Sequence, residues 1–519
     1  MADSHQGPLE KLRAYLHTTQ LLGSIHSALY YDQNTTMPAA GADWRGEQLA
    51  LLAQQLHGRQ SSGAYADLLS AAEAQWDGTP GPLGRNLQLL RQEFERQHRL
   101  DAALVGQIAQ AQAQGYARWQ EAKAKGDFSL FAPSLQELVG LRKEQARQLA
   151  EPRSCWETLA QPFEPDVSKA RLDVLFAPLR HELPTLIERA RSAASRQPSI
   201  AWDLPESSQQ KLCQELLNGW GFDPTRCQTA RSPHPFSCTL GPADFRITTR
   251  VVAGQPLSAL LATAHEWGHS LYEQGLPRSG DHYFPWPLGD ATSMGVHESQ
   301  SLFWECRVGR SQAFAQRLEP SIAAAWSLAN PGSGGASPGA PSPWCNSQGF
   351  WRCLNPLEPG MIRVEADEIS YCLHIVLRYE LELALLEGDL PVAELPGHWN
   401  RRMAELLDLR PAHDSEGCLQ DVHWSEGLFG YFPSYALGHL ISAQLGEAME
   451  RDLGGAGSIE ARVAKGDGAS LKQWLAEHVY PLGRQVNGEE LVKQVSGRDL
   501  RAEPFLAYLR AKLDRLVAP

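Results

Sequence analysis

Two histidines and a glutamate in the segment 265–269, His-Glu-Trp-Gly-His, have the types and spacing of a metal-dependent hydrolytic site. The surrounding residues 257–274 have the pattern of a helix, where residues four apart lie on one face, so His265 and His269 can share a metal ion. Glu266 follows the first ligand and could reach a water bound to that metal. This arrangement is typical of hydrolysis by zinc-activated water. The chain holds 17 histidines, so chance could also produce the pattern, and the rest of the sequence has to decide.

A zinc ion held by two histidines needs a third protein ligand. The extended motif with a later glycine and histidine is absent, because Tyr272 and Gly275 occupy those positions. Glu273 lies about 12 Å along the helix axis from His265, which is too far for shared coordination. Four downstream carboxylates remain as candidates, namely Asp281, Asp290, Glu298 and Glu305.

Glu298 is favoured by its place at the start of a second helical pattern that runs through Phe303 and Trp304. A glutamate on a helix after the first pair can face it, as in enzymes whose zinc is held by two histidines and one glutamate. The neighbouring His297 could also be a ligand, although a structural role is the simpler reading. The spacing thus predicts His265 and His269 as metal ligands and favours Glu298 as the third, with the other three carboxylates still open.

The elements that must position these residues are mostly helices. Apolar residues recur with helical spacing, and packing into the hydrophobic core is the simplest explanation of this pattern. Helices are predicted over 7–30, 45–56, 83–104, 105–125, 133–150, 169–194 and 207–220. One clear strand is predicted over 244–252, where apolar and polar residues alternate.

Composition excludes several classes of protein. The chain has 519 residues, 43% of them hydrophobic and 21% charged, with a net charge of −13, so a soluble protein that does not bind nucleic acid is expected. No stretch approaches about 18 consecutive apolar residues, and the first twelve residues lack the apolar centre of a signal peptide. The nine cysteines include no Cys-x-x-Cys pair, so neither a disulfide framework nor a cysteine zinc site is expected. A reducing cytoplasm is the default location.

One segment differs from the rest of the chain in amino-acid composition. Residues 330–343 are rich in Gly, Ser, Pro and Ala, which favours a surface loop. Helical patterning resumes near Met361 with residues that belong to the same candidate site. The sequence therefore predicts one catalytic domain over 1–519, with a Pro/Gly-rich loop insertion over 330–358.

Several ordered motifs then resemble the thermostable carboxypeptidase 1 family of zinc metallocarboxypeptidases. They are His234-Pro235-Phe236, Asp244-x-Arg246-x-Thr248, His265-Glu266-x-x-His269, His297-Glu298-Ser299-Gln300, Ile362-Arg363-x-x-Ala366-Asp367 and Gly417-x-x-Gln420-Asp421-x-His423-Trp424, followed by Tyr431-Phe432-Pro433-Ser434-Tyr435. The resemblance covers nearly the whole chain. Two departures are Tyr31, where the family often has Trp, and the longer segment near 330–358.

The resemblance implies a mainly α fold, with two helical halves flanking a deep substrate groove and a small β element near the zinc. It implies removal of single residues from peptide C-termini with broad specificity, one Zn²⁺ per chain, and a homodimer, which is common in the family. By motif match, His265, His269 and Glu298 correspond to zinc ligands and Glu266 to the catalytic glutamate. The sequence leaves open whether cobalt can replace zinc.

The catalytic candidates are a general base for the attacking water and hydrogen-bond donors for the tetrahedral oxyanion. Glu266 would take the proton of the attacking water and pass it to the leaving amine. His423 and Tyr431 resemble the oxyanion-side pair of related helical dipeptidases. Tyr435 lies one turn beyond Tyr431 if that segment is helical, so either tyrosine could face the groove.

A carboxypeptidase must also bind a free carboxylate, for which the planar fork of arginine is well suited. Arg363 is the candidate, and Asp367 four residues later is expected to hold it; an ordinary helical ion pair is the alternative. Asp244 and Arg246 share one face of the predicted strand and could bind substrate or brace the strand. His234, whose backbone is kept extended by the following proline, could contact substrate or serve structure.

Two other functions remain open. A helical zinc oligopeptidase that cuts internal bonds would share the metal site but would tolerate peptides with an amidated C-terminus. A non-catalytic peptide-binding scaffold would bind zinc and peptide without releasing amino acids, and the intact Glu266 argues against it.

Overall fold

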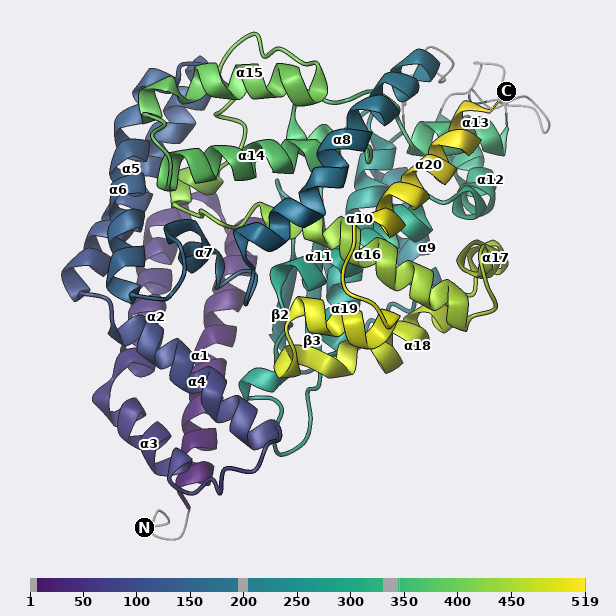
Figure 1. Ribbon diagram of the computed structural model, residues 1–519. Helices are drawn as coiled ribbons and strands as arrows, with labels where there is room; N and C mark the ends of the chain where they lie inside the picture. The colour runs from purple at the N-terminus through teal and green to yellow at the C-terminus, as the bar shows by residue number, and fades with distance from the viewer. Residues whose placement is uncertain (1–6, 195–203, 330–343, 345, 519) are drawn as a thin grey trace.

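The chain is mainly helical, as the sequence predicts. The computed structural model describes residues 7–194, 204–329, 344 and 346–518. These residues form twenty α-helices and one three-stranded sheet (Figure 1). The predicted groove between two helical halves, and the single domain over 1–519, stay predictions.

The first half of the chain contributes nine helices before the sheet. They are α1 (Pro8–Thr35), α2 (Ala42–Ser61), α3 (Gly63–Glu73), α4 (Pro82–His98), α5 (Ala102–Lys125), α6 (Ala132–Leu149), α7 (Cys155–Ala160), α8 (Lys169–Ala194) and α9 (Glu206–Gly219). The helix predicted over 83–104 is wrong at its end, because α4 stops at His98 and Asp101 caps α5 by accepting a hydrogen bond from the Ala103 N–H at 3.0 Å. An aspartate at this position satisfies a backbone donor that the helix leaves unpaired.

The small sheet lies between α9 and α10. Its strands are β1 (Cys227–Arg231), β2 (Ser237–Gly241) and β3 (Asp244–Thr249), in the order β1-β3-β2. β3 is parallel to β1 and antiparallel to β2. The strand predicted to reach residue 252 ends at Thr249, because the β1 ladder ends where Arg231 pairs with that residue.

Three helices at the centre of the molecule carry the three predicted metal ligands, Glu266 and Tyr435 (Figure 1). They are α10 (Pro256–Gly275), α11 (Met294–Leu302) with its π-helical continuation η4 (Phe303–Gly309), and α16 (Pro433–Asp452). Two glycines allow them to approach closely. A Cβ on Gly268 would lie 2.6 Å from Ser301 Cα on α11, and a Cβ on Gly438 would lie 2.6 Å from Glu298 Cγ. α11 is therefore held tightly between α10 and α16.

The second half of the chain packs around this centre. Its other helices are α12 (Gln312–Ala329), α13 (Ser347–Leu354), α14 (Tyr371–Leu386), α15 (Leu395–Leu407), α17 (Ser458–Lys465), α18 (Gly468–His478), α19 (Gly488–Ser496) and α20 (Glu503–Val517). The predicted loop insertion over 330–358 does not extend over α13, whose Phe350, Trp351 and Leu354 are buried. Residues 330–343 and 345 lie outside the described residues.

Short 3-10 turns link several of these helices. They are η1 (Ala39–Gly41), η2 (Phe128–Leu130), η3 (Pro287–Gly289), η5 (Arg363–Glu365), η6 (Val392–Glu394), η7 (His423–Glu426) and η8 (Tyr480–Gln485). Two of them, η5 and η7, carry candidate site residues.

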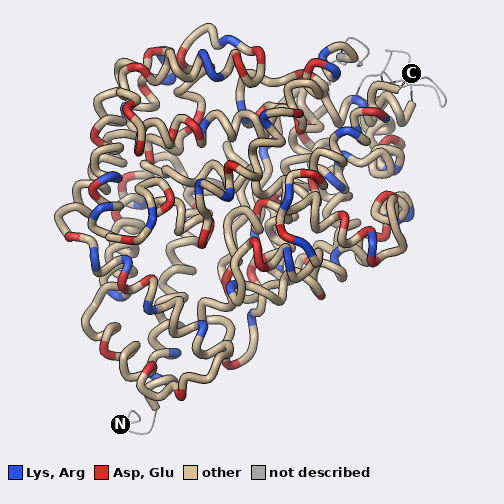
Figure 2. The backbone as a smooth tube through the Cα atoms, viewed as in Figure 1, with Lys and Arg blue, Asp and Glu red and all other residues tan. Residues whose placement is uncertain are grey.

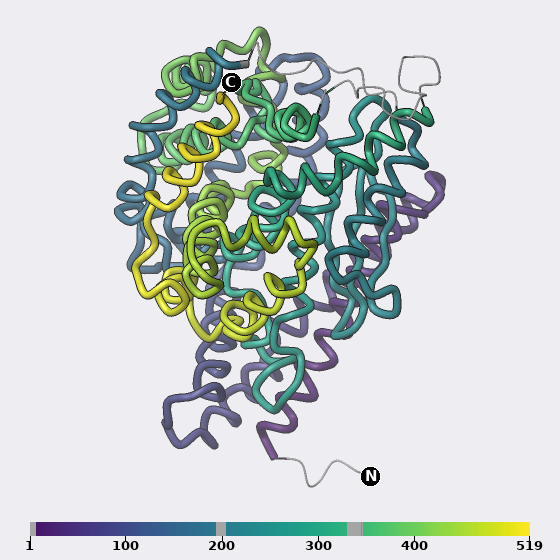
Figure 3. The backbone as a smooth tube through the Cα atoms, turned by 90° about the vertical axis from the view of Figure 1, so that its right-hand side faces the viewer, coloured from purple at the N-terminus to yellow at the C-terminus, as the bar shows by residue number. Residues whose placement is uncertain are grey.

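One large apolar cluster runs through most of the helices, and a smaller one joins the first turns of α1 to α3, α4 and Trp286. α1 begins at the bottom and α20 ends near the top of two perpendicular views (Figures 1 and 3). Acidic and basic residues are interspersed along most elements in the view of Figure 2. Among the described helices, none has the length and apolar character needed to cross a bilayer.

Candidate active site

The three predicted metal ligands come together in the structure. One ligand atom from each of His265, His269 and Glu298 lies within 4.8 Å of the others. Glu298 Oε2 is 3.5 Å from His269 Nε2 and 3.9 Å from His265 Nε2. Ligands about 2.0–2.2 Å from a tetrahedral zinc are about 3.4 Å apart, so the 3.5 Å separation matches this value and the wider ones need small shifts of the side chains. Two imidazoles and a carboxylate are a donor set suited to a divalent metal. The three side chains keep 12–23% of their surface exposed, which leaves the site open to a small ligand.

The far nitrogen of His265 is held by an acidic partner. His265 Nδ1 lies 2.9 Å from Glu305 Oε2, and Arg310 donates to the other oxygen of that carboxylate at 2.9 and 3.1 Å. Glu305 lies on η4, a π-helical segment of the kind often found at functional sites. A carboxylate on Nδ1 fixes the imidazole so that Nε2 points at the metal position and makes it a stronger ligand.

A second chain of contacts holds His269. His297 Nδ1 lies 2.6 Å from His269 Nδ1, and His297 Nε2 lies 3.1 Å from Glu273 Oε1. Glu273 also pairs with Arg278. When His269 Nε2 binds a metal, its Nδ1–H donates to His297, whose Nε2–H donates to Glu273. His297 and Glu273 therefore fix the imidazole of His269, a predicted metal ligand, which is a structural role for His297.

We expect Glu305→Gln to lower metal affinity by about tenfold to a hundredfold, because the neutral amide no longer strengthens His265 as a ligand. Competition with a coloured chelator would measure the affinity, and the thermal midpoint of the metal-free protein would report on folding. Glu206→Gln is the control, since Glu206 forms an exposed pair with Arg231. Equal affinities of Glu305→Gln and the wild type would contradict this role.

Glu266 lies on α10 beside the ligand triad and is 8% exposed. Burial raises the pKa of its carboxyl to about 7, with the His265 charge opposing the shift and the Glu298 charge adding to it. A carboxyl whose pKa is near neutrality can both accept and release a proton under physiological conditions.

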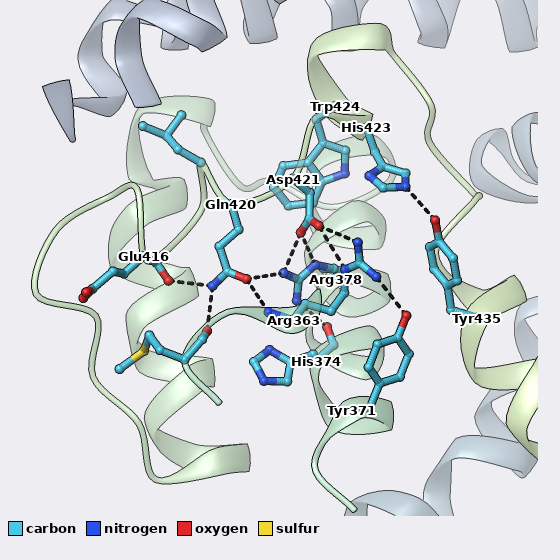
Figure 4. A network of polar contacts seen from close by, with 12 residues as sticks. Arg363, Tyr371, His374, Arg378, Glu416, Gln420, Asp421, His423, Trp424 and Tyr435 are labelled. Carbon is cyan, nitrogen blue, oxygen red and sulfur yellow. Dashed lines mark hydrogen bonds and ion pairs between the residues drawn. The ribbon is translucent and has the colours of Figure 1, made fainter. Parts of the chain in front are cut away.

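Arg363 is buried and lies in a network of polar contacts (Figure 4). Its Nε donates to Asp421 Oδ1 at 2.9 Å, and one terminal nitrogen donates to the Tyr371 hydroxyl at 2.8 Å. The expectation that Asp367 holds Arg363 is wrong. Asp367 instead accepts the backbone N–H groups of Ile369 and Ser370 at 3.0 and 2.7 Å, which fixes the start of α14.

His423, Tyr431 and Tyr435 form one cluster, although they come from η7, a loop and α16. The ring centroids of His423 and Tyr431 are 5.3 Å apart, and those of the two tyrosines are 5.4 Å apart. His423 Nε2 lies 3.2 Å from the Tyr435 hydroxyl. Burial, with Glu298 as the next cause, raises the pKa of Tyr431 to about 12. Burial also lowers the pKa of His423 to about 4, so its imidazole is neutral.

The chain matches the family model described as Carboxypeptidase Taq (M32) metallopeptidase over residues 11–513. The chain belongs to the M32 family of metallopeptidases. It is 35% identical to thermostable carboxypeptidase 1 of Thermus thermophilus, covering 97% of this chain and 98% of that one. It is 32% identical to carboxypeptidase 1 of Bacillus subtilis, covering 97% of each chain.

Solved structures agree with this assignment. The M32 carboxypeptidase of Deinococcus radiodurans superposes with a TM-score of 0.91 at 33% identity, covering 98% of this chain and 99% of the other. Metallocarboxypeptidase 1 of Trypanosoma cruzi superposes with a TM-score of 0.90 at 31% identity, with the same coverage. The predicted family is thus confirmed, and this M32 protein is a carboxypeptidase, a peptide hydrolase that uses a divalent metal.

The other predicted substrate residues of this M32 enzyme lie on β3 or in the turn before β2. Asp244 and Arg246 form a two-point ion pair, with hydrogen bonds of 2.7 and 2.8 Å. The Arg246 guanidinium also stacks 5.0 Å from the Tyr31 ring on α1. The backbone carbonyl of His234 accepts a hydrogen bond from the Ser232 hydroxyl at 2.5 Å. These contacts brace the strand and the turn before it, and substrate binding by the three residues stays a prediction.

Several buried polar residues close to the candidate site of this M32 enzyme were not predicted from the sequence. On α14, His374, Arg378 and Glu382 are all 0% exposed and recur every four residues, so they share one face of an otherwise apolar helix. Glu382 accepts hydrogen bonds from the indoles of Trp156 and Trp424 at 2.9 and 3.0 Å. Charged residues in so apolar a helix are a usable signal, because buried charges need partners.

Proposed function

We propose that this M32 enzyme is a zinc-dependent carboxypeptidase that releases single residues of many types from the C-termini of peptides. The observation that carries the proposal is a buried arginine, Arg363, whose guanidinium lies 4.8 Å from the ring of Tyr435 on α16, the helix that packs against Glu298. A cation at that place can bind the terminal carboxylate while the scissile carbonyl lies at the metal. Two histidines and one glutamate with an open position are a donor set typical of catalytic zinc.

Catalysis would divide among the residues around the ligand triad. The bound metal supplies an activated water and polarises the scissile carbonyl. Glu266 accepts the proton of that water and passes it to the leaving amine. His423, Tyr431 and Tyr435 provide imidazole and phenol donors for the developing oxyanion, since their cluster lies near Glu298.

Arg363 would bind the terminal carboxylate of the substrate. Arginine has five N–H donors, and the contacts of Arg363 to Asp421 and Tyr371 use one on each of its three nitrogens. The two remaining donors suit the two oxygens of a carboxylate. The Tyr371 hydroxyl accepts from Arg363, so its own proton is free to donate to the same ligand. His234, Asp244 and Arg246 would contact the peptide upstream of the cleaved bond.

The deciding experiment compares a short unblocked peptide with the same peptide amidated at its C-terminus, and follows the products by mass spectrometry. We expect stepwise shortening of the free acid from its C-terminus, slow attack on the amide, loss of activity with chelator, and recovery with Zn²⁺; Co²⁺ in parallel tests substitution. Equal cleavage of acid and amide at internal bonds would assign an endopeptidase instead. Zinc binding without any product would assign a binding scaffold.

A homodimer and a cytoplasmic location are further parts of the proposal, and they rest on the family resemblance and on the cysteines. Every cysteine among the described residues is a free thiol, consistent with a reducing compartment. Light scattering on the purified protein would give the mass directly, and a monomer at micromolar concentration would contradict the dimer.

A further inference from the structure

Arg378 is a buried cation close to Arg363. It lies on α14, is 0% exposed, and packs against the rings of Trp399 and Phe432 at 4.6 and 5.4 Å. Its Nε donates to Asp421 Oδ2 at 2.7 Å, and a terminal nitrogen donates to Gln420 Oε1 at 2.9 Å. So enclosed a side chain does not reach a bound peptide, and any effect on substrate must pass through its partners.

The main partner, Asp421, is shared between two arginines. Arg363 lies 2.8–2.9 Å from Oδ1, and Arg378 lies 2.6–2.7 Å from Oδ2 (Figure 4). Although burial opposes it, the two guanidinium groups hold the pKa of Asp421 far below its usual value, so the carboxyl is ionised. Two cations share one anion, and the group Arg363–Asp421–Arg378 keeps one net positive charge in a low-dielectric place.

The carboxylates near this group have other partners: Glu382, one turn beyond Arg378 on α14, accepts hydrogen bonds from Trp156, Trp424 and the Gly430 N–H, and burial raises its pKa to about 7. Lys123 is a further cation beside residues 420–421. Its Nζ donates to the Gln420 carbonyl at 2.7 Å and lies close enough to interact with Asp421. Glu298 is the carboxylate on the site side, and it is a metal ligand whose charge a bound divalent cation exceeds. His374 is neutral, because burial lowers its pKa to about 3.

We propose that Arg378 is a positioning residue for recognition of the peptide C-terminus: by binding the second oxygen of Asp421, it prevents that carboxylate from neutralising Arg363. With Arg378 absent, Asp421 and Arg363 would form a one-to-one pair, and an incoming carboxylate would meet a neutral group. The inference rests on the proposed role of Arg363. It explains why a buried arginine and a partly buried aspartate accompany the carboxylate-binding arginine.

The test measures kcat and KM for an N-blocked dipeptide as the free acid and as the C-terminal amide. We expect Arg378→Met to lower kcat/KM for the acid by about tenfold to a hundredfold, equal to about 1.4–2.8 kcal/mol. The loss should lie in KM, and the amide should change little, so the preference for the acid falls. Arg378→Lys keeps the charge and should keep most of the preference. Arg402→Met is the control, because Arg402 pairs with Glu380 on the outer side of α14.

The possible outcomes distinguish failure of this inference from failure of the proposed carboxypeptidase function. Arg378→Met leaves Asp421 and Arg363 as a balanced pair, so it should fold; Arg378→Gln is the second neutral variant if it does not. Suppose that the wild type prefers the acid and that Arg363→Met abolishes this preference. If both neutral Arg378 variants then retain the preference, the inference is overturned and the proposed function stands. If the wild type cleaves acid and amide equally, both fail. Equal losses on acid and amide would mark Arg378 as merely structural and also overturn the inference.

Discussion

Glu266→Gln should slow peptide hydrolysis by about 10²–10⁴-fold while leaving metal binding unchanged. Glutamine keeps the size of the side chain on α10 but cannot take a proton from water. The ligand atoms of His265, His269 and Glu298 are not altered, so the metal should bind as before. Because Glu266 is almost buried beside the triad, its replacement should lower kcat far more than it raises KM.

Two measurements are needed to read this variant. Release of the C-terminal residue gives kcat and KM, and chelator competition gives metal affinity. Glu206→Gln serves again as the exposed control. A variant that keeps more than a tenth of the wild-type kcat would remove Glu266 from the proton transfer. A variant that loses the metal would show instead that the carboxylate stabilises the metal site.

Asp421→Asn should lower the free energy of unfolding by about 3–5 kcal/mol, because it leaves two buried guanidinium groups without a counter-charge. Both oxygens of Asp421 bind arginines, and Arg378 has no access to water. The neutral amide of asparagine has a single acceptor oxygen, so it cannot bind both guanidinium groups as the carboxylate does. Arg363 and Arg378 would then repel each other.

Thermal and urea unfolding of the metal-free protein would measure this loss. Asp499→Asn is the matched control, since Asp499 is 70% exposed and pairs with Lys493. Adding Arg378→Met to Asp421→Asn removes one of the two unpaired charges and should recover part of the stability. A single variant as stable as the wild type would contradict the view that Asp421 is required to balance the two arginines.

The sequence was most informative where the candidate catalytic residues lie on a single helix or strand with a clear periodicity. His265 and His269 lie four residues apart on one helix, so their spacing alone predicts a shared face, and α10 has the predicted bounds to within one residue at each end. The strand at Asp244 was found in the same way, from alternation, and only its end was misplaced.

Contacts between distant segments were harder to predict. Asp367 was expected to hold Arg363 because it lies four residues later, but the segment is a 3-10 turn and Asp367 accepts backbone N–H groups. The partner of Arg363 is Asp421, 58 residues away. No spacing rule connects these positions, because the packing of α14 against the following turns decides which charges meet.

The sequence by itself determined the helix that carries the two histidines, the family and the mainly helical fold. Local periodicity carries this information, since the geometry of a helix or strand repeats every few residues. Only the tertiary structure decided how Glu305, His297 and Glu273 hold the ligands, and how two arginines share Asp421. Such contacts depend on glycines that let helices approach and on buried charges that must find partners anywhere in the chain.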